Sequence, residues 1–194
     1  MDSTTYNTAG FIIERLKNYF ASNCKFIVTN TFIYNDRWET DVFMLKQSGY
    51  TYEIEVKISK ADFKRDFKKT DKHIILEQGK IQKKEHVLMR DDNGKVIKDS
   101  NGRYKYDVVI NLIDAGDKRP NKFYYCAPEG ILSLEEIPSY AGFITINNSV
   151  LKIVKEAPLL HKGKYDYTKI LCDRFYYYWQ NAELQLKRMK SKIQ

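Results

Sequence analysis

The chain has 194 residues, of which 43% are hydrophobic and 14% aromatic, including 15 tyrosines. This length is usual for one domain, and the composition excludes an intrinsically disordered chain, which lacks aromatic and β-branched residues. The formal net charge of +8 and the pI near 9.2 favour a polyanionic partner such as nucleic acid, although a basic surface can also serve only solubility. We therefore predict a single domain over residues 1–194.

The cysteines and the N-terminus bear on the cellular compartment. Cys24, Cys126 and Cys172 are far apart and show no Cys-x-x-Cys spacing, which argues against a disulfide framework and a zinc cluster. The first ten residues lack the basic region and apolar run of a signal peptide, and no stretch approaches the roughly 20 apolar residues of a membrane-spanning helix. We expect a cytoplasmic protein without a membrane partner, in the host cell if a phage encodes it.

An N-terminal helix and a three-strand meander are predicted first. Asn7 or Thr8 can cap the helix, whose buried stripe repeats at helical spacing as Phe11, Ile12, Leu16, Tyr19 and Phe20. Runs of β-branched and aromatic residues then predict strands over 25–34, 38–46 and 50–59.

The turn at Gly49 sets the pairing of the second and third strands. A three-residue hairpin loop commonly ends in a residue with positive φ, which suits glycine, so Lys46 should pair with Tyr50. Counting outward puts Asp41 opposite Glu55, with Lys57 two residues further on the same face. The other face should lie in the core because it carries Val42, Met44, Tyr52, Ile54, Val56 and Ile58.

A basic helix is predicted next, followed by an insertion. Ser59 caps the helix, Asp62 lies at its third position, and Phe63, Phe67 and Ile74 form its buried stripe. Two Asn-Gly turns predict a protruding hairpin or loop at about 90–104, between two parts of one sheet. The outer side of the helix carries Lys60, Lys64, Arg65, Lys68, Lys69 and Lys72.

The remainder should complete a core of about 8–155 and add a C-terminal helix. Strands are expected over 104–113, 122–127, 142–147 and 150–155, the last two as a hairpin, with a short capping-box helix from Ser133 to Glu136. An amphipathic helix with a basic end is expected over about 165–192. Its aromatic run at 175–179 could stack on bases, but the helical spacing favours packing in the core.

Asp41, Glu55 and Lys57 form the candidate catalytic centre. Phosphodiester hydrolysis needs a hard divalent cation and an aligned water, and two carboxylates on adjacent strands suit Mg²⁺, which keeps several waters. An ammonium group beside the metal would orient the water or stabilise the phosphate. Glu-x-Lys alone is a weak motif, because such pairs also occur on solvated salt-bridge faces. Here the pair lies on an apolar strand, opposite an aspartate and before a basic helix.

The block from Asp41 to Lys69 resembles the PD-(D/E)xK nuclease superfamily, specifically the MmcB-like DNA repair proteins. Glu55-x-Lys57 precedes a segment like Ser-x-x-Asp-Phe-x-x-Asp-x-Lys, and residues 121–146 are similar to the family's aromatic strand, Pro-x-Gly turn and Tyr-Ala-Gly strand. The similarity covers roughly residues 11–155, and Thr40 stands where the superfamily's name has proline. The matched positions of the segment are Ser59, Asp62, Phe63, Asp66 and Lys68.

The resemblance implies an α/β fold, here an α+β arrangement in which helices flank a mixed sheet. The core would be restriction-endonuclease-like, and this chain adds a C-terminal helix to it. It implies Asp41 and Glu55 as ligands of Mg²⁺ or Mn²⁺, the Val56 carbonyl as a further ligand and Lys57 as the catalytic lysine. Glu14 is another candidate ligand, or an ordinary solvent-facing glutamate. The candidate contacts to DNA phosphates, which could equally be a solvated face balanced by aspartates, are Lys60, Arg65, Lys68, Lys69, Lys72 and His73.

The predicted function is a metal-dependent nuclease that hydrolyses DNA, in repair, recombination or the processing of phage or mobile-element DNA. One alternative is a catalytically silent nuclease-fold adaptor that binds nucleic acid, and another is an RNA-acting nuclease. Glu53 lies on the face of Glu55 and is expected to be an ion-pair partner rather than a ligand. A homodimer is compatible with the sequence but not indicated by it.

Overall fold

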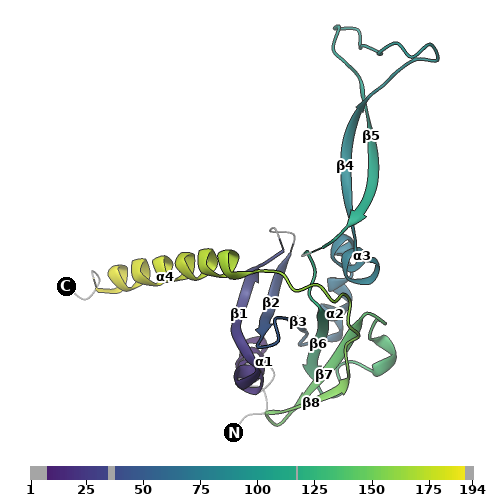
Figure 1. Ribbon diagram of the computed structural model, residues 1–194. Coiled ribbons are helices and arrows are strands. Elements are labelled where there is room, and N and C mark those ends of the chain that lie inside the picture. Colours follow the sequence, from purple (N-terminus) through teal and green to yellow (C-terminus); the bar gives the residue numbers. More distant parts are fainter. Residues whose placement is uncertain (1–7, 35–37, 117, 191–194) are drawn as a thin grey trace.

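The computed structural model describes residues 8–34, 38–116 and 118–190. Its body is a six-stranded sheet made of β1 (Cys24–Phe32), β2 (Glu39–Lys46), β3 (Thr51–Val56), β6 (Lys122–Pro128), β7 (Ala141–Asn147) and β8 (Val150–Lys155). The strands lie in the order β1-β2-β3-β6-β7-β8 (Figure 1). Because β6 is parallel to β3 and β7 while the other neighbours are antiparallel, the sheet is mixed. The predicted fold class is confirmed, and the restriction-endonuclease-like core stays a prediction.

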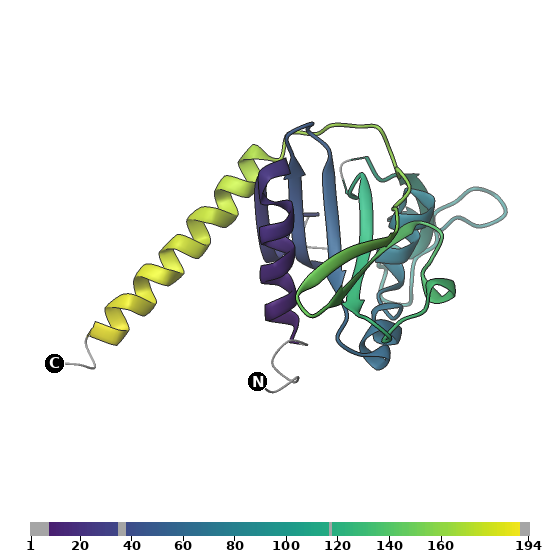
Figure 2. The same cartoon turned by 90° about the horizontal axis from the view of Figure 1, so that it is seen from below.

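Helices cover both faces of this sheet (Figure 2). On one face, α1 (Ala9–Phe20) packs Ile12 and Leu16 against a core that includes Val42 and Ile54. On the other face, α2 (Lys60–Asp66) and α3 (Thr70–Gln78) pack against β6. The two faces therefore have separate cores, and the face of β3 that carries Glu55 is the one under α2 and α3.

The predicted start of α1 is confirmed at Thr8, whose hydroxyl accepts a hydrogen bond from the N–H of Phe11. The alternative cap Asn7 lies outside the described residues. A 3₁₀ turn (Ala21–Asn23, η2) joins α1 to β1. Four of the six predicted core positions on β2 and β3 are buried against α1, Tyr52 is partly buried, and Ile58 is exposed because β3 ends at Val56.

The β2–β3 hairpin has the predicted register. Gly49 has a φ of +85°, and the backbone N–H of Lys46 donates to the carbonyl of Tyr50 at 2.8 Å. Val42 consequently pairs with Ile54. A residue with a Cβ would be strained at this φ, so the glycine determines which side chains share a face.

The prediction of a single basic helix from Lys60 through Ile74 is wrong, because the chain forms two helices, α2 and α3, with a break after Phe67. Phe67 is exposed and Ile74 only half-buried, whereas Lys72, Ile75 and Leu76 are buried. The inward face of α3 contains a lysine that is held by carboxylates, and hydrophobic spacing does not detect such a residue.

The insertion is longer than the predicted 90–104 and forms a sheet of its own. β4 (Lys80–Leu88) pairs antiparallel with β5 (Tyr106–Asp114) in a ribbon that projects beyond α3 (Figure 1). The prediction that residues 104–113 join the main sheet is therefore wrong. The alternating apolar residues of β5 resemble those of a core strand, but they are exposed in the ribbon: Tyr106, Val108, Ile110 and Leu112.

The tip of the ribbon consists of two turns with the same pattern, Asp-x-Asn-Gly followed by Lys or Arg. Asp91 and Asp99 each accept two backbone N–H groups through one carboxylate oxygen. Gly94 and Gly102 have φ values of +76° and +78°. The predicted Asn-Gly turns are thus present, one after the other.

In the C-terminal part the predicted helices and strands are present, but the last helix does not pack as predicted. Ser133 and Glu136 form the predicted capping box of a 3₁₀ helix (Leu134–Glu136, η3), and β7 and β8 form the predicted hairpin. α4 (Thr168–Lys190) begins slightly later than predicted, and its aromatic run is exposed rather than in the core. In the part of the chain that is described, no helix is both long and apolar enough to cross a membrane.

Candidate active site

The structure brings the three predicted catalytic residues together. Continuing the Val42–Ile54 pairing by one residue sets Asp41 of β2 opposite Glu55 of β3. The Asp41 carboxylate accepts a hydrogen bond from the N–H of Val56 at 2.8 Å. Lys57, directly after β3, donates from Nζ to Oε2 of Glu55 at 2.9 Å. The hairpin register and the alternation of β3 therefore place two carboxylates and an ammonium group side by side.

A second lysine, Lys72 of α3, reaches the same glutamate. Its Nζ lies 2.6 Å from Oε1 of Glu55, so each oxygen of Glu55 has an ammonium partner. Lys72 also lies 3.7 Å from Glu53 and 3.7 Å from Asp66, and Lys57 lies 3.3 Å from Asp66. With only 1% of Lys72 exposed, this is a buried ionic cluster rather than a surface salt bridge.

Two aromatic side chains hold the outer acids of this cluster. Tyr125 of β6 donates its hydroxyl to Asp66 Oδ2 at 3.0 Å, and Trp38 donates its indole N–H to Glu53 Oε1 at 2.9 Å. Neither aromatic residue was predicted to belong to the site. The resemblance had matched Asp66 to the family pattern without a role, and Glu53, expected to be an ion-pair partner, lies 3.7 Å from the Lys72 ammonium group.

The pKa values of Glu55, Asp66 and Lys57 are shifted so that all three groups are charged at neutral pH. Burial alone would raise the pKa of Glu55, but the ammonium groups of Lys72 and Lys57 outweigh it and lower that pKa below its ordinary value. Burial would also raise the pKa of Asp66, but the same two lysines outweigh it and lower that pKa. Burial would lower the pKa of Lys57, but Glu55 and Asp66 raise it above the ordinary value. Lys57 is therefore a permanent cation and not a general base.

Asp41 and Glu53 are the carboxylates that the lysines do not neutralise. Burial, and then the negative charge of Glu55, raises the pKa of Asp41 to about 6. Burial raises the pKa of Glu53 to about 8, although Lys72 opposes the shift. At pH 7 the two lysines thus balance Glu55 and Asp66, Glu53 is mostly neutral, and Asp41 adds a negative charge.

The donor set of this site suits a small, hard divalent cation. Asp41 is ionised at pH 7 and makes no ion pair among the described residues, and Glu55 lies across from it. Because the N–H of Val56 points to Asp41, its carbonyl faces the same neighbouring strand. Among the described residues no three His, Cys, Asp or Glu side chains are grouped to hold one ion. Two carboxylates are nevertheless sufficient for Mg²⁺ that keeps water or phosphate ligands.

Three of the other candidate residues do not have the positions that their predicted roles require. Glu14 pairs with Lys17 at 2.9 Å on the exposed side of α1, on the sheet face opposite to Glu55, so it is not a ligand. Lys72 is buried and therefore is not a surface contact for DNA. His73 is half-buried, hydrogen-bonded to Tyr140 and to the backbone carbonyl of Asp66. Its surroundings make it a structural side chain.

The remaining basic candidates have exposed side chains. Lys60 pairs with Glu136 at 2.9 Å, and Lys69 pairs with Asp66 at 3.3 Å while about half of its side chain stays exposed. A hollow of about 260 Å³ lies next to Lys72, lined by Trp38 and the 68–72 segment. Lys68 and Lys69 therefore flank an opening beside the ionic cluster, and Arg65 is exposed on α2.

Comparisons with known proteins inform the fold only. No protein-family model matches the chain, and no curated protein matches it. A solved structure, described as the SPO1766 protein of unknown function from Silicibacter pomeroyi, is similar with a TM-score of 0.52 and 16% sequence identity. The match covers 90% of this chain and 88% of that one. The arrangement of the elements is thus also found in another protein, whose function is unknown.

Proposed function

We propose that this protein is a metal-dependent nuclease that hydrolyses DNA, with Asp41 and Glu55 holding Mg²⁺ or Mn²⁺. The observation that carries the proposal is the position of Asp41: an ionised, partly buried carboxylate that faces Glu55 without a lysine of its own. When bound, a divalent cation would offset the charge that develops on the phosphate and lower the pKa of a bound water. The Val56 carbonyl is a third oxygen on the same side.

The chain's own residues support this chemistry through charge and position. Lys57 remains an ammonium group at any physiological pH, so it stabilises a phosphate oxygen instead of removing a proton. Asp66, which accepts a hydrogen bond from Tyr125, lies 3.3 Å from the Lys57 ammonium group and helps to position it. Lys68 and Lys69, beside the hollow next to the cluster, supply positive charge where a polyanionic strand would approach.

The test is cleavage of single- and double-stranded DNA with Mg²⁺ or Mn²⁺, compared among the wild type, Glu55→Gln and Glu14→Gln. We expect metal-dependent products from the wild type and Glu14→Gln, and none from Glu55→Gln. Glu14→Gln is the matched control because it removes a glutamate charge on the opposite side of the sheet. Absence of metal-dependent products from the wild type, or equal products from Glu55→Gln, would contradict the proposal.

A second candidate function is a nuclease-fold module that binds DNA without cutting it. The observation that favours it is the pair of ammonium groups on Glu55, at 2.9 and 2.6 Å, because a metal ion would compete with both. Titration calorimetry with Mn²⁺ separates the two candidates. Binding that Asp41→Asn abolishes supports the nuclease, whereas salt-sensitive DNA binding in EDTA, without Mn²⁺ binding or cleavage, supports the module.

A further inference from the structure

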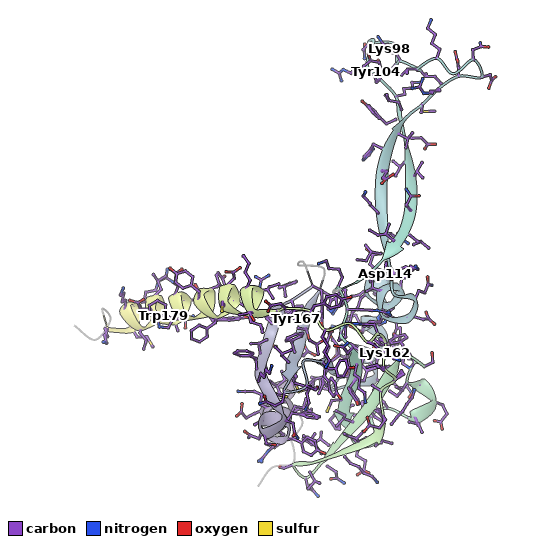
Figure 3. The ribbon with its side chains drawn as sticks, in the orientation of Figure 1. Lys98, Tyr104, Asp114, Lys162, Tyr167 and Trp179 are labelled. Carbon is purple, nitrogen blue, oxygen red and sulfur yellow. The ribbon has the colours of Figure 1, made fainter. Side chains whose placement is uncertain are left out.

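In the described part of the chain, the first half of the C-terminal helix α4 attaches it to the body. Leu171 is buried, the guanidinium of Arg174 donates to the carbonyl of Phe32 at 2.9 Å, and the hydroxyl of Tyr178 donates to the carbonyl of Asn30 at 2.6 Å. Beyond these contacts the helix extends away from the sheet (Figures 1 and 2), and Figure 3 shows Trp179 on this projecting part. Isolated helices shorter than about 12–15 residues are marginal in water, and the part of α4 after Tyr178 is about this short, so packing against a partner would stabilise it.

A continuous apolar seam runs along α4 on a different side from its contacts with the body. Its members follow one another at intervals of three, four, three, four and three residues, the spacing of a and d positions in a coiled coil. All are exposed, including Phe175 at 72% and Trp179 at 54%. The seam consists of Cys172, Phe175, Trp179, Ala182, Leu186 and Met189.

The chemistry of the seam identifies a second helix as the partner. The six positions have the a and d spacing that suits packing against one other helix, and the other exposed apolar side chains of α4 lie beside them: Tyr176, Tyr177, Tyr178 and Leu184. None of the six side chains is charged, so the seam does not match the phosphates of a nucleic acid. Its length, about 26 Å from Cys172 to Met189, is enough for several layers of side chains.

Side-chain size and charge indicate that this helix is α4 of a second copy, running antiparallel. In that arrangement the bulky Trp179 faces Ala182 of the second copy, Phe175 faces Leu186, and Cys172 faces Met189, so each layer has a similar volume. The parallel arrangement would stack Trp179 on Trp179 and leave space at Ala182. It would also bring together the two basic C-terminal ends, which carry Lys187, Arg188 and Lys190.

We propose that the protein forms a homodimer through antiparallel pairing of α4 along this seam. A two-fold axis then makes the interface the same on both copies. This dimer would form whether or not the protein is a nuclease, because the seam lies on a projecting helix and the acid and lysine cluster lies under α2 and α3.

Sedimentation equilibrium of the full chain tests the dimer. We expect a concentration-dependent dimer for the wild type, a loss of at least tenfold in affinity for Leu186→Glu, and no loss for Leu184→Glu. The two leucines are 53% and 50% exposed on the same helix, but only Leu186 belongs to the seam. A wild type that stays monomeric, or equal losses from both variants, would overturn the proposal.

Oxidative crosslinking tests the orientation. In the antiparallel dimer Cys172 lies close to position 189 of the second copy, so Met189→Cys should form a disulfide-linked dimer that Cys172→Ser removes. Of the three cysteines, Cys24 and Cys126 are buried and Cys172 is exposed, so the background is low. Efficient crosslinking of the wild type through Cys172 alone would show a parallel pair and overturn the antiparallel arrangement.

Discussion

Lys72 is a buried ammonium group among three carboxylates, and its removal should first affect stability. We expect Lys72→Met to lower the free energy of unfolding at pH 7 by about 3–5 kcal/mol, because Glu55 would lose its closest counter-charge in a desolvated position. Lys69→Met is the control, since this lysine is half exposed and its ion pair should contribute at most about 1 kcal/mol. Urea unfolding measures both, and similar losses would show that Lys72 is not the central cation.

Asp41 should destabilise the fold at neutral pH. The folded chain holds its proton more tightly than the unfolded chain, with the pKa raised from 3.8 to about 6, so stability falls as the pH rises through this range. The shift corresponds to about 3 kcal/mol above pH 6. Asp41→Asn should therefore stabilise the protein at pH 7.5 by about 1–3 kcal/mol and have no such effect below pH 4. Denaturant unfolding at both pH values checks this, and a gain that persists at low pH would contradict it.

The part of the site that could be predicted is the part that strand alternation and hairpin register place. Strand alternation and the hairpin turn were sufficient to bring Asp41, Glu55 and Lys57 together. Lys72 was beyond prediction, because a lysine in a basic helix normally faces water and its burial depends on acids supplied by other elements. Trp38 and Tyr125 hold acids that are far away in the sequence, so only the folded chain shows their roles.

At the scale of elements, the β2–β3 hairpin depends on the left-handed conformation of Gly49. We expect Gly49→Ala to lower the free energy of unfolding by about 1–2 kcal/mol through backbone strain. The added Cβ would lie 3.4 Å from Lys164, an ordinary contact, so little of this loss would come from steric overlap. Ser48→Ala in the same turn is the control in thermal or chemical unfolding. An unchanged stability for Gly49→Ala would show that the turn adapts without strain.

Helices and strands were predicted correctly where one hydrophobic periodicity runs through the segment. They were predicted incorrectly where the buried side of the chain changes within the segment. The strands that flank the site and the cap at Thr8 follow from local patterns. α2 and α3 were predicted as one helix because Phe67, a member of the expected stripe, turns outward at the break. The amphipathic pattern of α4 indicated correctly that a helix forms, but it could not distinguish a buried core from an open seam.

The packed body should be independent of the β4–β5 ribbon. We expect the free energy of unfolding to change by less than about 1 kcal/mol when Gln82 is joined to Leu112 through Asn-Gly. The excised part lies outside the main sheet, and Ile81, which packs in the core, is kept. Denaturant unfolding that remains cooperative with a similar midpoint would support this expectation. A loss of cooperativity would show that the ribbon is part of the core.

Composition predicted that the chain folds, but not how its apolar residues are distributed. Many of them lie on the ribbon and on α4 rather than in the body; Figure 3 shows Tyr104 at the ribbon tip and Trp179 on α4. A hydrophobic fraction of 43% would look the same if all of these residues were in one core. The two projecting elements are therefore a property of the tertiary structure.

The two-stranded form of the ribbon has a consequence for hydrogen exchange. Each of its strands has one neighbour, whereas β3 and β6 lie inside the sheet, and a lone pair of strands is marginally stable in water. Amide protons of β4 and β5 should therefore exchange through local opening, much faster than those of β3 and β6, which require global unfolding. Any molecule that binds along the ribbon would then slow exchange there against an almost unprotected background, so mass spectrometry could locate such a contact before its chemistry is known.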